Sequence, residues 1–264
     1  MSTTDSFVPE QRPPVVLRRA RTEDGSCRHQ LVWKAGPGWR MVSSAVLGGG
    51  LGERGWVLNA QVRPGYSRMD PDRHLAELAA AEGLNGPGVG LMTAAEVDDC
   101  TWSEDGGAVA LVTTGIGVPT WAADPGASVP VPFAPAPSRP APFVPGTINI
   151  LAVVPAPVTD GGLVNLLATA TEAKVQALLE AGYDCSGTPS DAVCVAVRTP
   201  GTPAAADPFG GPRSVWGSRL ARAVHRAVLD GAERDRVRRD RGASVPHQGP
   251  SPECCRENVL HAGR

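Results

Sequence analysis

The sequence predicts an α+β protein, a single domain with one mixed, largely antiparallel sheet covered by about three helices. Two observations support this class. Short β-rich apolar runs recur along the chain with Gly-Pro turns between the early ones, and only three segments combine helical periodicity with capping residues. The helices do not alternate strictly with strands, as a parallel α/β sheet would require. A chain of 264 residues is long enough for one domain with a sizeable core.

The first half of the chain contains most of the predicted strands. Residues 29–35 and 40–47 are expected to form a hairpin around the turn at 36–38, and 56–62 a third strand. A helix is predicted over 70–83, because Asp70 suits the N-cap, Pro71 the first helical position and Gly83 the C-terminal cap. Two further strands are expected at 88–94 and 108–116.

The second half of the chain is predicted to form two helices and two buried strands. Residues 147–154 and 192–197 are apolar runs typical of strands, and 214–230 is amphipathic. The longest helix is expected to open at Thr159 and end at Gly182, with Asn165, Thr169, Glu172, Gln176 and Glu180 on its polar face. Lys174 falls in the middle of the apolar face. It is therefore expected to reach the rim, to form a structural ion pair, or to point at a functional group.

Composition indicates where the domain begins and ends. Residues 1–26 are polar and aperiodic, and 231–264 are charged and then polar, so both are predicted to be disordered tails around a domain at 27–230. Residues 125–145 contain eight prolines without periodicity. By composition alone this stretch is either an interdomain linker or an extended surface insertion.

Charge, hydropathy and cysteine spacing exclude several classes of function. A net charge of −2 gives no argument for a nucleic-acid partner. The sequence contains no run of 18 apolar residues, so no membrane span is predicted, and the N-terminus does not resemble a signal peptide. The six cysteines lack zinc-site spacing, so no metal site is expected. A cytoplasmic protein with reduced thiols is the expectation.

A glycine-rich stretch at 41–55 carries the most distinctive pattern. Residues 50–55 match G-x-G-x-x-G, but a dinucleotide site needs a helix directly after the glycines, and a β-like run follows here. The stretch is therefore either a hairpin tip or a backbone loop that lines a substrate pocket. Ser43 and Ser44 would point to opposite faces of a strand, so at most one can face a given pocket.

Three other polar groups are candidates for a site. His74 lies on the core-facing edge of its predicted helix, where it is either a packed histidine or a base. Thr113 and Thr114 form a hydroxyl cluster at a strand end. Residues 187–191 place two hydroxyls and a carboxylate in one turn before a buried strand, an arrangement that also suits a simple Asx or ST turn.

Taken in order, these stretches resemble the adenosylcobinamide amidohydrolase family. The resemblance runs from about residue 27 to 230 and rests on these residues: 43–45, 48–50, Asn59, Asp70-Pro71 with His74, 90–95, 113–115, 147–149, 171–174 and 187–191. It continues on both sides of 125–145, which implies an insertion within one domain. The late loop, Gly-Thr-Pro-Ser-Asp at 187–191, departs from the family's usual Gly-Thr-Gly-Thr-Asp. Pro189 stands at the second glycine position, where it fixes φ and removes an N–H.

The resemblance implies hydrolysis of the amide that joins cobyric acid to aminopropanol in adenosylcobinamide, giving adenosylcobyric acid for cobalamin salvage. The corrinoid would then be the substrate, and no cofactor is expected. For catalysis we expect His74 or Asp191 as base, Ser44 or Thr93 as the hydroxyl, and Lys174 or Asn59 to orient the carbonyl or the amine. Substrate contacts are expected from Ser43, Gly48, Gly49, Gly50, Asn59, Thr114, Thr188 and Ser190. The alternatives are a corrinoid-binding protein or chaperone without catalysis, and an amidohydrolase acting on other amides.

Overall fold

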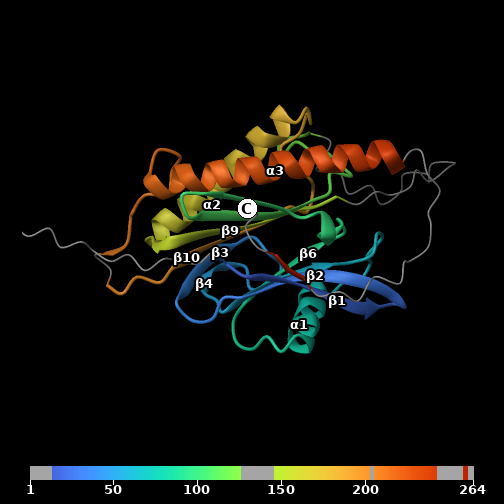
Figure 1. Ribbon diagram of the computed structural model, residues 1–264, viewed down its shortest axis with the longest axis horizontal. Helices are drawn as coiled ribbons and strands as arrows, with labels where there is room; N and C mark the ends of the chain where they lie inside the picture. The colour runs from blue at the N-terminus through green and yellow to red at the C-terminus, as the bar shows by residue number, and fades with distance from the viewer. Residues whose placement is uncertain (1–13, 126–145, 203–204, 243–257, 261–264) are drawn as a thin grey trace, which may run out of the picture.

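The computed structural model describes residues 14–125, 146–202, 205–242 and 258–260. These residues form four layers, in which one helix, two sheets and a pair of helices are stacked (Figure 1). The predicted α+β class, the single domain and the three helices are confirmed. The single sheet that we expected is wrong, since the strands divide into two sheets that pack face to face.

The smaller sheet has five strands in the order β11-β1-β2-β5-β6. Their bounds are β1 Val16–Glu23, β2 Ser26–Lys34, β5 Trp56–Gln61, β6 Val89–Thr93 and β11 Asn258–Leu260. All pairs are antiparallel except β5 and β6, which are parallel and joined by helix α1, Pro71–Ala81. The buried residues Leu58, Leu75 and Ala79 pack this helix against the outer face of the sheet.

The larger sheet has six strands in the order β4-β3-β10-β9-β8-β7. Their bounds are β3 Trp39–Ser43, β4 Gly50–Glu53, β7 Thr101–Asp105, β8 Ala108–Thr114, β9 Ile148–Pro157 and β10 Ala192–Arg198. A short 3₁₀ turn, η1 Val97–Asp99, precedes β7. Only β9 and β10 pair in parallel, and helix α2, Asp160–Glu180, connects them. Helices α2 and α3, Val215–Gly242, cover the outer face of this sheet (Figure 1).

Strands of the larger sheet are buried on both faces. In β9, Ile150 and Val154 belong to the core under the helices, whereas Leu151 and Val153 belong to the core between the sheets. Alternate side chains of a strand point to opposite faces, and here both faces meet apolar layers. This double burial explains why β8, β9 and β10 read as continuous apolar runs in the sequence.

The predicted N-terminal ends of α1 and α2 agree with the structure, whereas α3 continues to Gly242, beyond its predicted end at residue 230. Pro71 begins α1, and Asp70 stands at its N-cap, although its side chain makes no capping hydrogen bond and pairs with Arg68 instead. Thr159 caps α2, where its Oγ1 accepts a hydrogen bond from the Gly162 N–H at 3.2 Å. The longest helix, however, is α3 with 28 residues, not α2 with 21, so that expectation was wrong.

The predicted hairpin between the first two strands is also wrong. β2 pairs with β1 and β5 in the smaller sheet, whereas β3 pairs with β4 and β10 in the larger one. The turn at residues 36–38 therefore carries the chain from one sheet to the other. A glycine-proline turn marks a reversal of direction, but it does not specify that the two strands become neighbours.

Both predicted tails contain regular structure within the described residues. The proposed tail at 1–26 includes all of β1, whose Arg18 pairs with Asp98 at 2.6 Å, so disorder there is wrong for residues 16–23. The proposed tail at 231–264 begins inside α3, where Asp235 is buried and pairs with Arg239. Residues 1–13, 126–145, 243–257 and 261–264 lie outside the described part, and with them nearly all of the predicted insertion.

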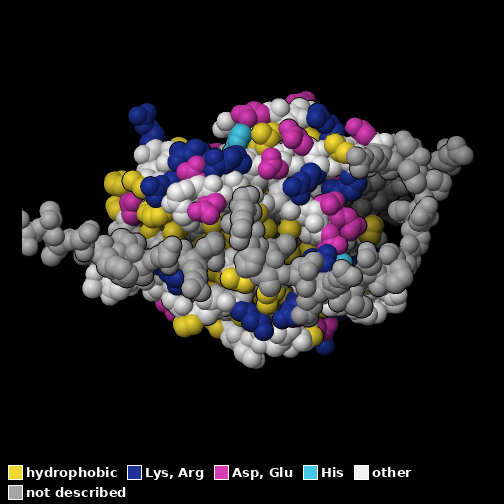
Figure 2. Space-filling view, in the orientation of Figure 1, with side chains coloured by type: hydrophobic (Ala, Val, Ile, Leu, Met, Phe, Trp, Pro, Cys, Tyr) yellow, Lys and Arg dark blue, Asp and Glu magenta, His cyan; other side chains and the backbone are white. Residues whose placement is uncertain are grey.

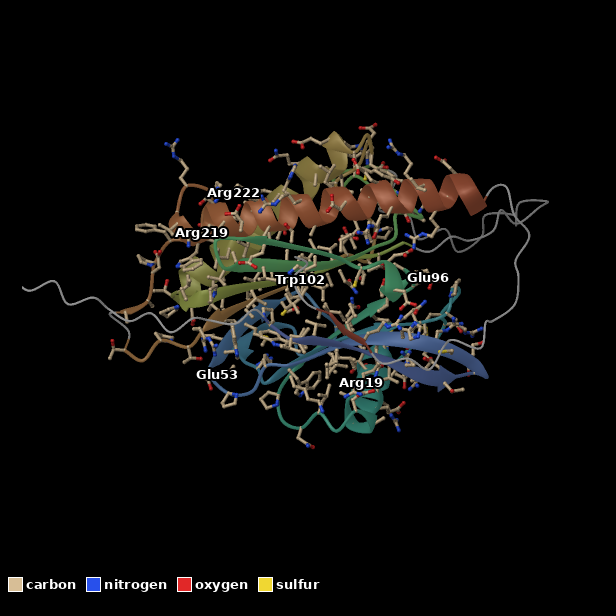
Figure 3. All side chains as sticks on the ribbon, in the orientation of Figure 1. Arg19, Glu53, Glu96, Trp102, Arg219 and Arg222 are labelled. Atoms are coloured by element: carbon tan, nitrogen blue, oxygen red, sulfur yellow. The ribbon has the colours of Figure 1, made fainter. Side chains whose placement is uncertain are left out.

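Charged pairs attach α3 to the sheet beneath it. Arg222 donates to both carboxylate oxygens of Asp105 at the end of β7, at 2.6 and 2.9 Å (Figure 3). Arg222 and Arg226, which also donates to Asp105, lower the pKa of Asp105 to about 2, mainly through the hydrogen bond from Arg222. Figure 2 shows that basic and acidic side chains are interspersed over this helix, which therefore presents no uniformly basic face.

Candidate active site

A pocket of about 530 Å³ lies where the two sheets meet at the ends of their strands. Its walls come from the segments after β3, β5 and β6 and from the segments before β9 and β10. Small and aliphatic side chains make up about half of the lining. The polar members are Ser44, Arg63, Tyr66, Thr93, Thr147, Ser190 and Asp191.

Ser43 and Ser44 point in different directions, as the alternation of a strand predicts. Ser43 is buried, donates to the Val193 carbonyl at 3.0 Å and accepts from the Ala45 N–H at 3.1 Å, so it is fully used by the fold. Ser44 is exposed and lines the pocket, and its Oγ accepts from the Val193 N–H at 3.0 Å. The hydroxyl proton of Ser44 has no acceptor among the described residues, so it can be donated to a ligand.

The three glycines at 48–50 do not line this pocket, although we expected them to contact substrate. Gly48 has φ +67°, and a Cβ there would lie 1.8 Å from the Gly88 carbonyl oxygen. The neighbouring Leu47 carbonyl accepts a hydrogen bond from the Gly90 N–H at 3.0 Å. The glycines thus allow the segment after Ser44 to approach β6 closely, and this contact positions Ser44 rather than the ligand.

Asp191 is a partly buried acceptor whose lone pairs are already used. Its Oδ1 accepts from the Ile148 N–H at 2.9 Å and the Thr188 hydroxyl at 2.5 Å, and its Oδ2 from the Thr188 N–H at 3.1 Å and Lys174 Nζ at 2.5 Å. A carboxylate has about four such acceptor positions. Asp191 reaches the pocket wall, but its arrangement fits a fixed structural anion better than a free base.

Lys174 is therefore explained by an ion pair. Its side chain is 8% exposed and that of Asp191 is 10% exposed. A Cβ on Gly187 would lie 2.2 Å from Asp191 Oδ2 and 2.5 Å from Lys174 Nζ, so a side chain there would displace the ion pair. The predicted polar position Thr169, on the same helix, is also buried, and its hydroxyl donates to the Gly210 carbonyl at 3.0 Å.

Further hydroxyls of the pocket bind one another or the backbone. Ser190 Oγ lies 2.7 Å from Thr147 Oγ1, so one of them donates to the other. Thr93 is buried, and its Oγ1 accepts from the Ala95 N–H at 3.0 Å. Thr188 is bonded to Asp191 and does not line the pocket.

Two further predicted site residues, Asn59 and Thr114, lie away from the pocket. Asn59 is buried between the sheets, donates to Thr113 Oγ1 at 3.0 Å and accepts from Asn149 at 2.9 Å. Asn149 also donates to the Met92 carbonyl at 2.9 Å, which ties β9 to β6 beside the pocket. Thr114 is buried against Gly231 of α3. These residues support the walls without reaching a ligand in this pocket.

His74 does not line the pocket, but it contacts a residue that does. Tyr66 Oη lies 3.0 Å from His74 Nδ1, and the two ring planes differ by 9°. On the other side of the ring, His74 Nε2 lies 3.4 Å from Glu23 Oε1 of β1. Burial lowers the pKa of His74, an effect that Glu23 partly offsets, and burial also raises the pKa of Tyr66. Neither Tyr66 nor Glu23 was predicted from the sequence as a site residue.

Comparisons with known proteins identify the family of this chain. The family model described as Adenosylcobinamide amidohydrolase matches residues 14–240. The chain belongs to this family. It is also 29% identical over 198 residues to the Adenosylcobinamide amidohydrolase of Methanosarcina mazei, a match that covers 72% of this chain and 88% of the relative.

This member of the adenosylcobinamide amidohydrolase family contains no evident metal centre in its described part. No three His, Cys, Asp or Glu side chains gather there in a way that could hold a metal ion. None of the helices described has the length and apolar character needed to span a bilayer.

Cys100, Cys185 and Cys194 are free, but Cys27 is disulfide-bonded, so the expectation of uniformly reduced thiols is wrong for this residue.

Proposed function

We propose that this protein hydrolyses the amide between cobyric acid and aminopropanol in adenosylcobinamide, releasing adenosylcobyric acid for cobalamin salvage. The family match over residues 14–240 is the observation that carries the proposal. The pocket supports it independently, because hydroxyls from two exposed serines, two buried threonines and one tyrosine surround a cavity whose lining is about half small and aliphatic side chains. Sites for small molecules usually combine apolar walls with a few placed polar groups.

The size of the pocket suggests which part of the substrate enters it. A volume of about 530 Å³ suits a molecule of ordinary drug size, and a corrinoid is much larger than that. The aminopropanol arm and its amide therefore enter the pocket, while the corrin ring stays at the mouth. Exposed Val46 and Arg63 lie on the lining and are placed to contact the ring or its peripheral amides.

Ser44 is placed to stabilise the reacting carbonyl. Hydrolysis of an unactivated amide requires the barrier to fall by about 15–20 kcal/mol, and a hydrogen-bond donor aimed at the oxyanion contributes roughly 10²–10³ in rate. The Val193 N–H holds the Ser44 oxygen, which leaves its proton free for the oxyanion. Among the described residues no histidine or carboxylate hydrogen-bonds to Ser44, so activated water is a better nucleophile than this serine.

The corrinoid enters this proposal as substrate, and we propose no resident cofactor. Lys174 and Asp191 hold the loop at 187–191 against the start of β9, and so shape the pocket without taking part in proton transfer. We further propose a cytoplasmic location, where cobalamin synthesis would use the product. The free thiols of Cys100, Cys185 and Cys194 support this location, and the disulfide at Cys27 weighs against it; fractionation of the native host would decide.

The test is a product assay with the full-length protein. Adenosylcobinamide and cobinamide without the adenosyl group are incubated separately, and aminopropanol and the cobyric acid product are measured by mass spectrometry. We expect both products in equal amounts from adenosylcobinamide, and at least a 100-fold lower kcat in Ser44→Ala. A spectral shift of the corrinoid without aminopropanol would instead indicate a binding protein. Turnover of simple amides without a spectral shift would indicate a different amidohydrolase.

A further inference from the structure

Tyr66, His74 and Glu23 form a row of three polar side chains that begins at the pocket wall and ends in the smaller sheet: Tyr66 shares a hydrogen bond with His74, and the other nitrogen of His74 lies at ion-pair distance from Glu23. Tyr66 comes from the loop after β5, His74 from α1 and Glu23 from the end of β1. Only Tyr66 lines the pocket. The side chain of His74 is 6% exposed and that of Glu23 is 22% exposed.

The direction of the hydrogen bond between Tyr66 and His74 follows from the charges around the His74 ring. Arg21 pairs with Glu23 Oε2, which leaves Oε1 of the carboxylate facing His74 Nε2. A carboxylate can only accept, so Nε2 carries the proton of the neutral imidazole. Nδ1 is then a bare acceptor, and the Tyr66 hydroxyl donates to it. The Tyr66 oxygen therefore presents lone pairs, and not its proton, to the pocket.

We propose that Tyr66, His74 and Glu23 are the proton relay of the hydrolysis, with Tyr66 as the catalytic residue that touches the substrate. This inference rests on the proposed function. As water attacks the carbonyl carbon, it gives a proton to Tyr66 Oη while Tyr66 passes its own proton to His74 Nδ1. His74 becomes an imidazolium paired with the Glu23 carboxylate.

Collapse of the tetrahedral intermediate reverses the transfer. His74 returns the proton to Tyr66, and Tyr66 protonates the leaving aminopropanol nitrogen as the C–N bond breaks. The carboxyl product and the amine are released, and all three side chains regain their starting states. Water supplies both the oxygen added to the carbonyl and the proton added to nitrogen, so the step needs no other reactant.

The other candidate bases are not connected to the pocket by a free acceptor. All acceptor positions of Asp191 are used by Lys174, Thr188 and the Ile148 N–H. Among the three histidines of the described chain, His29 pairs with Asp98 and His225 with Glu180, and neither ring bonds to a residue of the pocket wall. His74 and Glu23 are positioning residues, since they act through Tyr66.

Tyr66→Phe is the direct test, and the chain supplies a matched control. Its only other tyrosine, Tyr183, bonds to Asp235 at 3.3 Å and does not line the pocket, so Tyr183→Phe removes a similar hydroxyl elsewhere. We expect Tyr66→Phe to lower kcat roughly 10²–10⁴-fold with little change in KM, and Tyr183→Phe to leave kcat within about two-fold. Thermal unfolding of each variant checks that it is folded.

His74→Gln and Glu23→Gln extend the test to the positioning residues. We expect both to lower kcat at unchanged corrinoid affinity, and the acid limb of the wild-type pH profile of kcat/KM to disappear in His74→Gln. The ionisable groups acting on His74 are Glu23, Arg68, Arg21 and Glu77, so each variant is compared at constant ionic strength.

Two results would overturn the relay while leaving the proposed function standing. In the first, the wild type turns over adenosylcobinamide and Tyr66→Phe keeps a kcat within about two-fold of the wild-type value. The other is a raised KM with unchanged kcat in Tyr66→Phe, which would make Tyr66 a binding residue. Failure of the proposed function looks different, because the wild type itself would bind adenosylcobinamide without releasing aminopropanol, and that result would reject the relay as well.

Discussion

Replacing Asp191 with Asn removes one charge of the buried Lys174 pair while keeping the size of the side chain. The variant leaves the ammonium of Lys174 facing an amide instead of a carboxylate, with its side chain 8% exposed. Loss of one member of a buried ion pair typically costs about 3–5 kcal/mol. For a domain of this size we therefore expect Asp191→Asn to lower Tm by about 6–20 °C.

The reciprocal variant, Lys174→Met, should cost less. Asp191 would still accept hydrogen bonds from the Ile148 N–H, the Thr188 N–H and the Thr188 hydroxyl, so its charge remains compensated. We expect Lys174→Met to lower the free energy of unfolding by roughly 1.5–3 kcal/mol, the usual contribution of a hydrogen bond to a charged group. The double variant buries no unpaired charge and should be more stable than Asp191→Asn alone.

Urea unfolding of the wild type, the two single variants and the double variant measures the four free energies of a double-mutant cycle, provided that the slope of the transition stays constant. The decisive comparison is between the two single variants, whose losses of unfolding free energy we expect to differ. Equal costs for Lys174→Met and Asp191→Asn would refute this expectation, because the three additional donors to Asp191 would then contribute nothing. A double variant less stable than Asp191→Asn would refute the claim that an unpaired buried charge dominates the loss.

Two further predictions concern the glycine turn and His74. Gly48→Ala should lower Tm clearly more than Gly50→Ala, because a Cβ at 48 meets a backbone oxygen at 1.8 Å whereas a Cβ at 50 meets open space, and both have positive φ; similar Tm values would contradict the steric argument. Burial lowers the pKa of His74 below 6.5, so the unfolded chain binds more protons and stability falls as pH drops from 6.5 toward the folded pKa. Urea unfolding at pH 7.5 and 5.5 should show a smaller loss in His74→Gln than in the wild type, and an equal loss would exclude this contribution.

The larger sheet shows what an apolar sequence pattern can and cannot predict. The runs in β8, β9 and β10 predicted the strands well, because burial on both faces favours apolar residues at nearly every position. The same double burial removes the alternation that would reveal which face meets which layer. The division into two sheets was therefore not visible, and the turn at 36–38 was read as a hairpin.

The candidate site was predictable only in part, for a similar reason. Ser44, Thr93, Ser190 and Asp191 lie at strand ends, where polar residues interrupt apolar runs, and the structure brings them to one pocket. Tyr66 lies in an aperiodic stretch beside Pro64 and Gly65, where no periodicity marks a side chain as inward-facing. Its importance comes from its contact with His74, which depends on how the loop folds back onto α1.

β1 was missed because its charges resemble those of a solvated segment. Arg18 and Arg21 are half-buried, yet they pair with Asp98 and Glu23 and thereby satisfy their charge within the fold. Local composition indicates a polar tail, and the pairing of Arg18 with Asp98, which lies far along the chain, cannot be seen from the residues of the strand itself. A strand of this kind needs knowledge of its neighbours before it can be predicted.

Neither sheet contains the pocket by itself. Ser44 and Asp191 belong to segments of the larger sheet, whereas Tyr66 and Thr93 belong to those of the smaller one. A partial opening that separates the sheets would thus abolish the site while most backbone hydrogen bonds within each sheet persist. Loss of ligand binding should then precede global unfolding as denaturant is added, and hydrogen exchange should show the two sheets as separate cooperative units that become competent only when joined.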